Sequence, residues 1–154
     1  MVENLKVIAK NKKAYYDYQV IEKIEVGIVL TGSEVKALRE GKGNLKDSYA
    51  RIKNNQIWII GMNIGTYTHT GIPGHNPERQ RKLLLHKDEI KRIYRKVTEK
   101  GVTLVPLKLY FKKGIVKIEL GVVTGKREYD KRVALTKRDQ ERELKRIEKK
   151  YRIK

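Results

Sequence analysis

The 154-residue sequence contains no cysteine, only three prolines, one tryptophan and one phenylalanine. The absence of cysteine excludes disulfide bonds, thiolate metal sites and cysteine nucleophiles, and it is compatible with a reducing compartment. The sequence also lacks any run of about 18 apolar residues, the length that a membrane-spanning helix needs. The N-terminus has no apolar stretch of the kind found in secretory signals. We therefore expect a cytoplasmic protein without a membrane partner.

Acidic residues are scarce beside basic ones. Lysine and arginine number 37 and aspartate and glutamate 18, which gives a formal net charge of +19. Charge of this size repels itself in a compact domain, so it is typical of proteins whose partner is a polyanion. Among polyanions, we expect the partner to be a nucleic acid.

The basic charge is concentrated at the C-terminal end of the chain. The 29 residues from Lys126 onward hold 13 lysines or arginines against 6 acids. With 39% hydrophobic residues, the chain can close one core and seldom two. We expect one folded domain over residues 1–125 and a basic tail over residues 126–154, disordered when free and helical where phosphates cancel its self-repulsion. A tail that only aids solubility is the alternative.

Between about residues 15 and 121, short apolar runs alternate with turn residues, a pattern typical of strands. Hairpin turns are expected at Asn54 with Asn55 and at Lys113 with Gly114. Another turn is expected between Glu22 and Glu25. A short helix over residues 34–43 and a longer amphipathic helix over residues 83–101 complete the pattern.

These elements amount to about six strands and two or three short helices. So many short antiparallel strands avoid exposed edges best by closing on themselves. The sequence therefore predicts a mainly β (α+β) fold, a small closed antiparallel OB-like β-barrel with flanking helices. A split β-α-β sandwich is the competing architecture.

Residues 66–82, TYTHTGIPGHNPERQRK, contain glycine, proline and polar residues in a density that predicts an exposed loop. Loops of this kind often carry function.

Three segments together resemble one known family: IEVGIVLTGSEVKALREGKGNLKDSYA, NPERQRKLLLHKDEI and VPLKLYFKKGIVKIELGVVTGKREYDKR. They resemble the bacterial SsrA-binding protein family, also called small protein B. The resemblance implies a non-catalytic, monomeric RNA-binding adaptor with an OB-like fold and no cofactor. It implies binding to the tRNA-like domain of transfer-messenger RNA and delivery of that RNA to stalled ribosomes for trans-translation. The tail is then expected to enter the vacant message channel and decoding centre.

The RNA-contacting positions that the resemblance implies fall on Glu25, Leu84, His86 and Lys117. A carboxylate such as Glu25 can accept hydrogen bonds from base amino groups or a 2′-hydroxyl, and a histidine can stack on a base. The residues alone favour a turn residue at Glu25, a core residue at Leu84 and a solvent-facing strand residue at Lys117. They leave His86 open between a base-stacking residue and a helix cap.

Arg79, Arg81 and Lys82 are expected near the same surface if the loop folds over the barrel, where their charge suits contacts with the RNA backbone. In the tail, the resemblance assigns a group of residues to the ribosome. Tyr129 is the aromatic member that can stack on a base. The group consists of Lys126, Arg127, Tyr129, Asp130, Lys131 and Arg132.

Two other classes of protein compete with this interpretation. An enzyme would use His69, His75 and His86, but these histidines lack the i, i+4 spacing of metal ligands on one helix face, and no catalytic motif accompanies them. A basic structural ribosomal protein is the second alternative. No metal site is expected.

Overall fold

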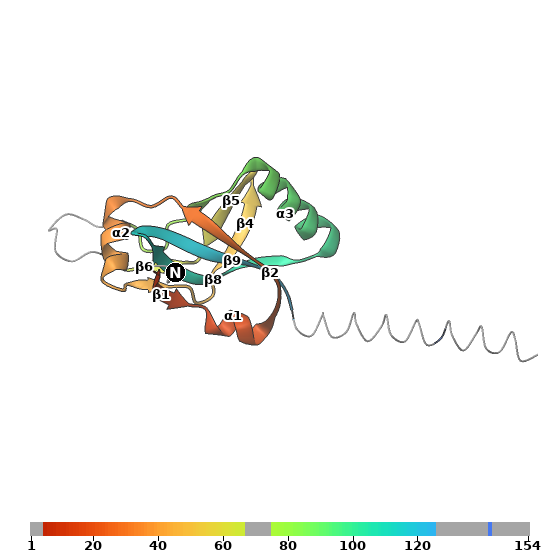
Figure 1. The fold of residues 1–154 in the computed structure, drawn as a ribbon, viewed down its shortest axis with the longest axis horizontal. Helices are drawn as coiled ribbons and strands as arrows, with labels where there is room; N and C mark the ends of the chain where they lie inside the picture. The colour runs from red at the N-terminus through yellow and green to blue at the C-terminus, as the bar shows by residue number, and fades with distance from the viewer. Residues whose placement is uncertain (1–4, 67–74, 126–141, 143–154) are drawn as a thin grey trace, which may run out of the picture.

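The computed structural model describes residues 5–66, 75–125 and 142. Within these residues nine strands and three helices follow one another along the chain (Figure 1). In order they are β1 (Leu5–Lys10), α1 (Lys12–Asp17), β2 (Tyr18–Ile28), α2 (Gly32–Arg39), β3 (Gly43–Asn44), β4 (Tyr49–Lys53), β5 (Gln56–Ile60), β6 (Asn63–Ile64), β7 (Arg81–Leu84), α3 (Lys87–Lys100), β8 (Thr103–Lys112) and β9 (Ile115–Gly125).

Six of the strands form a closed antiparallel ring. Their order is β8-β4-β5-β7-β2-β9, and β9 pairs with β8 again to complete the circuit. We call this arrangement the six-strand ring. Strand β1 adds to it by pairing with β8, and β3 pairs with β6 in a separate two-stranded sheet. The prediction of a mainly β, OB-like fold with about six strands is confirmed, and the split β-α-β sandwich is not the architecture.

Both predicted hairpin turns are confirmed. Asn54 and Asn55 have φ angles of 52° and 61°, and Lys113 and Gly114 have φ angles of 51° and 79°. Asparagine and glycine tolerate this left-handed backbone better than other residues do. The local sequence therefore fixes where β4 turns into β5 and where β8 turns into β9.

The predicted turn between Glu22 and Glu25 is wrong. Strand β2 runs through this region and pairs with β9 from Tyr18 to Gly27, with a register shift between Val20 and Glu22. The polar residues that suggested a turn alternate with the buried residues Ile24 and Val26. Alternation of this kind is the pattern of a strand with one solvated face.

The N-terminal β1 and α1 were not predicted from the sequence. Its N-cap Asn11 is buried and accepts a hydrogen bond from the Ala14 N–H at 3.1 Å. The Asn11 side-chain amide also donates to the Pro106 carbonyl oxygen at 3.0 Å. One side chain thus starts α1 and ties it to β8.

The strands of the six-strand ring supply most of the buried cluster. Helices α2 and α3 lie at opposite ends of the ring (Figure 1). Helix α2 contributes Ala37 and Leu38, and α3 contributes Ile90 and Ile93 to the same buried cluster as the strands. The predicted stop of α3 is confirmed, because Gly101 has the left-handed conformation at its C-terminal end. Within the described part of the chain, no helix is long and apolar enough to cross a membrane.

Candidate nucleic-acid interface

Four neighbouring strands bring residues that are far apart in sequence into one row on the outside of the ring. Gly27 of β2 pairs with Leu84 of β7 on one side and with Lys117 of β9 on the other. Lys117 pairs in turn with Tyr110 of β8. We call Leu84, Gly27, Lys117 and Tyr110 the outer row, in which Tyr110 is buried and Leu84 is exposed. Glu25 lies on the same face, because strand residues two positions apart point to one side.

Glu25 is held in place by two partners on β8. The Tyr110 hydroxyl donates to its carboxylate at 2.6 Å, and the Lys112 ammonium group donates at 3.2 Å. The Tyr110 hydrogen bond is the main cause that lowers the pKa of Glu25, with further lowering by Lys112 and by the charge of Lys117. Glu25 is therefore an exposed, ionised strand residue, and its interpretation as a turn residue is wrong.

Leu84 lies outside the core, with 53% of its surface exposed. A Cβ atom on Gly27 would lie 3.3 Å from both Cβ and Cδ1 of Leu84. The missing side chain of Gly27 therefore gives Leu84 room to lie across β2. The result is an apolar side chain on the outer surface, two strands away from the cationic Lys117.

His86 occupies the N-cap position of α3 and is exposed. Its backbone N–H donates to the Glu89 carboxylate at 3.2 Å. His86 therefore stands at the N-cap position, as the helix-cap interpretation predicts. Because the residue is exposed, it is also available to a ligand at the β7 end of the outer row.

Lys82 of β7 lies on the same side of the strand as Leu84 and pairs with Trp58 of β5. Trp58 pairs in turn with Arg51 of β4. Both Trp58 and Lys82 are half-buried. Sequence reasoning missed Trp58 and Arg51, although the only tryptophan of the chain stands in an alternating strand next to a predicted turn.

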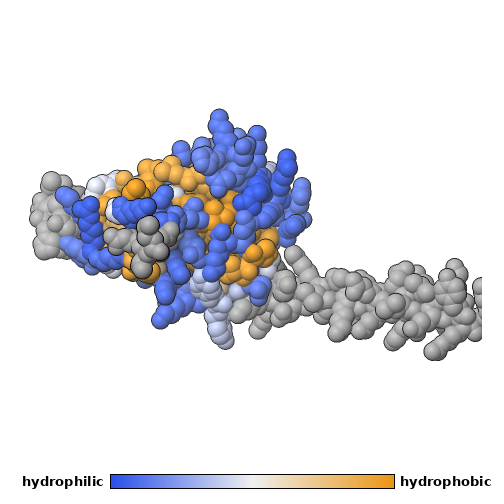
Figure 2. Space-filling view, viewed as in Figure 1, coloured by the Kyte–Doolittle hydropathy of each residue, from blue (hydrophilic) through white to orange (hydrophobic). Residues whose placement is uncertain are grey.

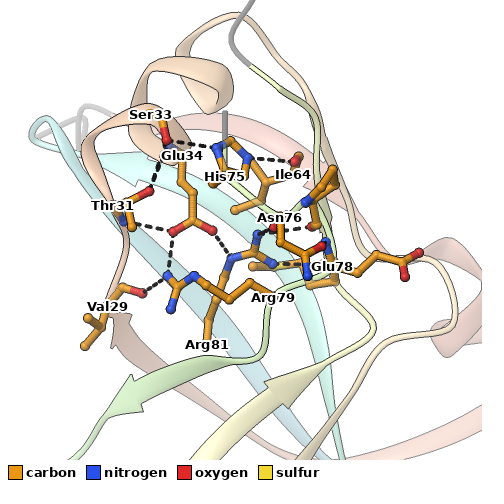
Figure 3. A network of polar contacts seen from close by, with 12 residues as sticks. Val29, Thr31, Ser33, Glu34, Ile64, His75, Asn76, Glu78, Arg79 and Arg81 are labelled. Carbon is orange, nitrogen blue, oxygen red and sulfur yellow. Dashed lines mark hydrogen bonds and ion pairs between the residues drawn. The ribbon is translucent and has the colours of Figure 1, made fainter. Parts of the chain in front are cut away.

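Arg81 does not lie on this surface. The prediction that it is an exposed loop residue is wrong, because Arg81 begins β7 and its side chain is completely buried. Its guanidinium forms an ion pair with the buried carboxylate of Glu34 and also donates to the backbone oxygens of Met62, Asn76 and Pro77 (Figure 3). A fully paired, buried arginine is structural, so we remove Arg81 from the candidate RNA contacts.

Arg79 belongs to the same network but reaches the surface. Its guanidinium donates to the Glu34 carboxylate at 2.5 Å and to the Val29 carbonyl oxygen at 3.4 Å, and the side chain is 35% exposed (Figure 3). Glu34 also accepts a hydrogen bond from the Thr31 N–H at 2.8 Å, which completes the capping box of α2. Helix α2 therefore begins at Gly32, two residues before the predicted start at Glu34.

His75, one of the three histidines considered for an enzyme, has a structural role. One ring nitrogen lies 2.9 Å from the Ser33 hydroxyl and the other lies 2.9 Å from the Ile64 carbonyl oxygen (Figure 3). His75 therefore joins α2 to β6. Among the described residues, no three histidine, aspartate or glutamate side chains gather into a group able to hold a metal ion.

Burial alone would raise the pKa of Glu34, but hydrogen bonds from Arg79, the Thr31 backbone and Arg81 outweigh it and lower the pKa from 4.5 to about 2. Folding therefore favours the ionised form. Its contribution to stability is complete above about pH 5 and is lost as the pH falls toward 2, a change on the order of 3 kcal/mol. We expect urea unfolding at a series of pH values to show this loss, and a Glu34→Gln variant to have a flatter profile over the same range. Parallel profiles would contradict the assignment.

The predicted ribosome contacts Lys126, Arg127, Tyr129, Asp130, Lys131 and Arg132 lie outside the described residues, as does His69. They stay predictions. Of the predicted RNA contacts, the structure brings Glu25, Leu84 and Lys117 together, places His86 and Lys82 beside them, and leaves Arg79 partly exposed near Val29.

The chain is similar in sequence to proteins of one family. Residues 8–150 match the family described as SmpB protein. The SsrA-binding protein of Syntrophobacter fumaroxidans is 53% identical over 150 residues, covering 97% of this chain and 93% of the relative. That of Treponema denticola is 54% identical over 142 residues, with 92% of each chain covered. A solved structure described as "tmRNA-SmpB: a journey to the center of the bacterial ribosome" is 43% identical with a TM-score of 0.64, covering 77% of this chain and 83% of that one.

Proposed function

The chain belongs to the SmpB protein family, and on this basis we infer that it binds transfer-messenger RNA and delivers it to stalled ribosomes in trans-translation. The outer row is the observation in the structure that carries this proposal. Together with Glu25 it presents an ionised carboxylate, an apolar side chain and a lysine on one face of a strongly basic chain. Such a surface offers a base or ribose a hydrogen-bond acceptor and an apolar contact, and it offers a phosphate a cation.

We assign RNA contact on this face to Glu25, Leu84, Lys117 and the neighbouring His86 and Lys82. Glu25 is oriented by Tyr110 and Lys112, so its carboxylate stays ionised and ready to accept hydrogen bonds. The protein works as an adaptor in the cytoplasm, and it contributes binding rather than a catalytic step.

A second part of the proposal concerns the division of the chain. Residues 1–125 bind the tRNA-like domain of the RNA, and residues 126–154 act on the ribosome. The support for this division is the charge distribution of the sequence, in which 13 of the 37 basic residues lie in the final 29 positions. The segment that follows β9 is thus suited to a polyanionic channel.

Co-purification tests the proposed function. The tagged full-length chain, recovered from cells at physiological ionic strength, is expected to carry one abundant RNA species with a tRNA-like domain, identified by sequencing. A matched preparation with Glu25→Ala and Lys117→Ala is expected to carry much less of it. Recovery of ribosomal RNA alone, in proportion to all ribosomes, would instead identify a structural ribosomal protein.

Replacing Lys117 with alanine is expected to weaken binding to the tRNA-like RNA and to flatten its salt dependence. One lost phosphate contact reduces the slope of log affinity against log salt by roughly 0.7 to 0.9. The measurement is a titration of labelled RNA at several salt concentrations. Lys46→Ala is the matched control, because Lys46 is an exposed lysine between β3 and β4, away from the outer row. An unchanged slope for Lys117→Ala would remove this lysine from the interface.

A further inference from the structure

A second concave surface lies between α3 and the β4–β5 hairpin, away from the outer row. It has a volume of about 270 Å³. A neighbouring hollow of about 280 Å³ lies between α3, β4 and β8 and shares Ile52 and Tyr94 with it. We call the two together the α3 groove. Its first part is lined by Ile52, Asn55, Gln56, Lys87, Ile90, Lys91 and Tyr94.

The lining offers one aromatic ring and two free carboxamides. Tyr94 is 52% exposed, and its hydroxyl has no hydrogen-bond partner among the described residues. The Asn55 and Gln56 carboxamides likewise make no hydrogen bond within the described part of the chain. Ile52 and the buried Ile90 supply apolar surface beside the ring. A planar ring with both an apolar face and a polar edge matches this lining.

Basic residues lie along the groove. Lys87, Lys91 and Arg95 follow one another at i, i+4 and i+8 on α3, so they lie on one side of the helix. Neither these three nor Arg51, which lines the second part of the groove, forms an ion pair among the described residues. Like charges at this spacing destabilise a helix, so the arrangement is suited to an anionic ligand. Figure 2 shows hydrophilic side chains over α3.

The basic residues on the other side of α3 form ion pairs. Arg92 forms an ion pair with Glu22 of β2 at 2.6 Å, and Lys96 pairs with the same carboxylate. The basic residues of α3 are therefore divided into two sets. One set attaches the helix to the ring. The other set forms no ion pair among the described residues, and two of its members, Lys87 and Lys91, line the groove.

We propose that the α3 groove binds an unpaired nucleotide of RNA. The base stacks on Tyr94, its polar edge faces Asn55 and Gln56, and the adjoining phosphates contact Lys91 and Arg95. The first part of the groove, with a volume of about 270 Å³, lies just below the range of about 300–1,000 Å³ typical of ligand pockets, so it suits one base rather than a larger molecule. This inference rests on the proposed function and adds a second RNA contact to it, over β4, β5 and α3 instead of β7, β2 and β9.

A substitution series at Tyr94 tests the stacking contact, with a short labelled oligouridylate as the probe. Tyr94→Leu keeps an apolar side chain but loses the ring, and we expect the affinity to fall roughly five-fold or more, whereas Tyr94→Phe keeps the ring and stays within about two-fold of the unaltered chain. Arg92→Ala is the matched charge control, because it removes a cation from the paired flank of the same helix. Equal affinity for the leucine and phenylalanine variants would overturn the proposal.

Photo-crosslinking identifies the source of the nucleotide. Transfer-messenger RNA and ribosomes, each carrying 4-thiouridine, are irradiated separately with the full-length chain, and the modified peptides are mapped by mass spectrometry. We expect adducts between Lys87 and Arg95 in at least one arm, and that arm identifies the RNA. Adducts near Lys117 without any on α3 would overturn this inference while leaving the proposed function intact. If the unaltered full-length chain does not bind the tRNA-like RNA, the proposed function is wrong instead.

Discussion

An Arg81→Met variant is expected to lower the free energy of unfolding by about 3–5 kcal/mol, because breaking a buried ion pair leaves an uncompensated charge inside the protein. The carboxylate that loses its partner is Glu34, which is completely buried. Methionine also removes the donors to the carbonyl oxygens of Met62 and Pro77. Urea unfolding measures the loss, with the single tryptophan, Trp58, as the fluorescent reporter.

Arg79→Met is the matched control for this experiment. Arg79 donates to the same carboxylate but is 35% exposed, so water can partly replace it. We expect a clearly smaller loss for Arg79→Met than for Arg81→Met. A double variant, Glu34→Leu with Arg81→Met, is expected to recover part of the stability because it removes both charges. A loss below about 1 kcal/mol for Arg81→Met would show that the buried pair is not the main link between α2 and β7.

Ending the chain after Tyr129 is expected to abolish rescue of stalled ribosomes while leaving affinity for the tRNA-like RNA largely intact. The physical reason is the segregation of charge, because the truncation removes the basic residues from Lys131 onward and leaves the outer row unchanged. Two measurements are needed: a titration with the isolated tRNA-like domain, and an assay of tag addition on ribosomes stalled without a stop codon.

A full-length chain with alanine at Lys131 and Arg132 separates the effect of tail length from that of these two charges. We expect this variant to bind the RNA normally and to be strongly impaired in rescue. If truncation instead abolishes binding to the tRNA-like RNA, the proposed division of labour between the ring and the tail is wrong. Full rescue activity in the truncated chain would contradict the role assigned to the tail.

The elements that could be predicted from the sequence are those with local determinants. The turn at Asn54 and Asn55 depends on two residues that tolerate positive φ. The end of α3 depends on one glycine, Gly101, after a run of helical periodicity. Neither requires knowledge of a distant partner. The mistaken turn between Glu22 and Glu25 arose because charged residues on the solvated face of β2 resemble a turn when the pairing with β9 is unknown.

The residues of the candidate site likewise divide into those that the sequence could predict and those whose placement depends on distant partners. The family resemblance selected Glu25, Leu84 and Lys117, and the strand register explains why they form one surface. Periodicity alone could not place Leu84 outside the core, because Leu83, Leu84 and Leu85 form an unbroken apolar run. Only the pairing of β7 with β2, where Leu84 meets Gly27, shows which of them faces outward. Arg81 was misplaced for a similar reason: a basic residue beside a polar loop resembles a surface residue until its partner Glu34, 47 positions away, is known.

The pairings that close the six-strand ring differ in length. Strands β8 and β9 pair along nearly their whole length, whereas β4 and β8 share a single pair in register, Ala50 with Leu104. Helix α3 lies over this junction, and its residue Val97 borders the same hollow as Ala50 and Leu104. Backbone pairing between β4 and β8 is therefore short, and the side chains of α3 bridge the two strands where the ring closes.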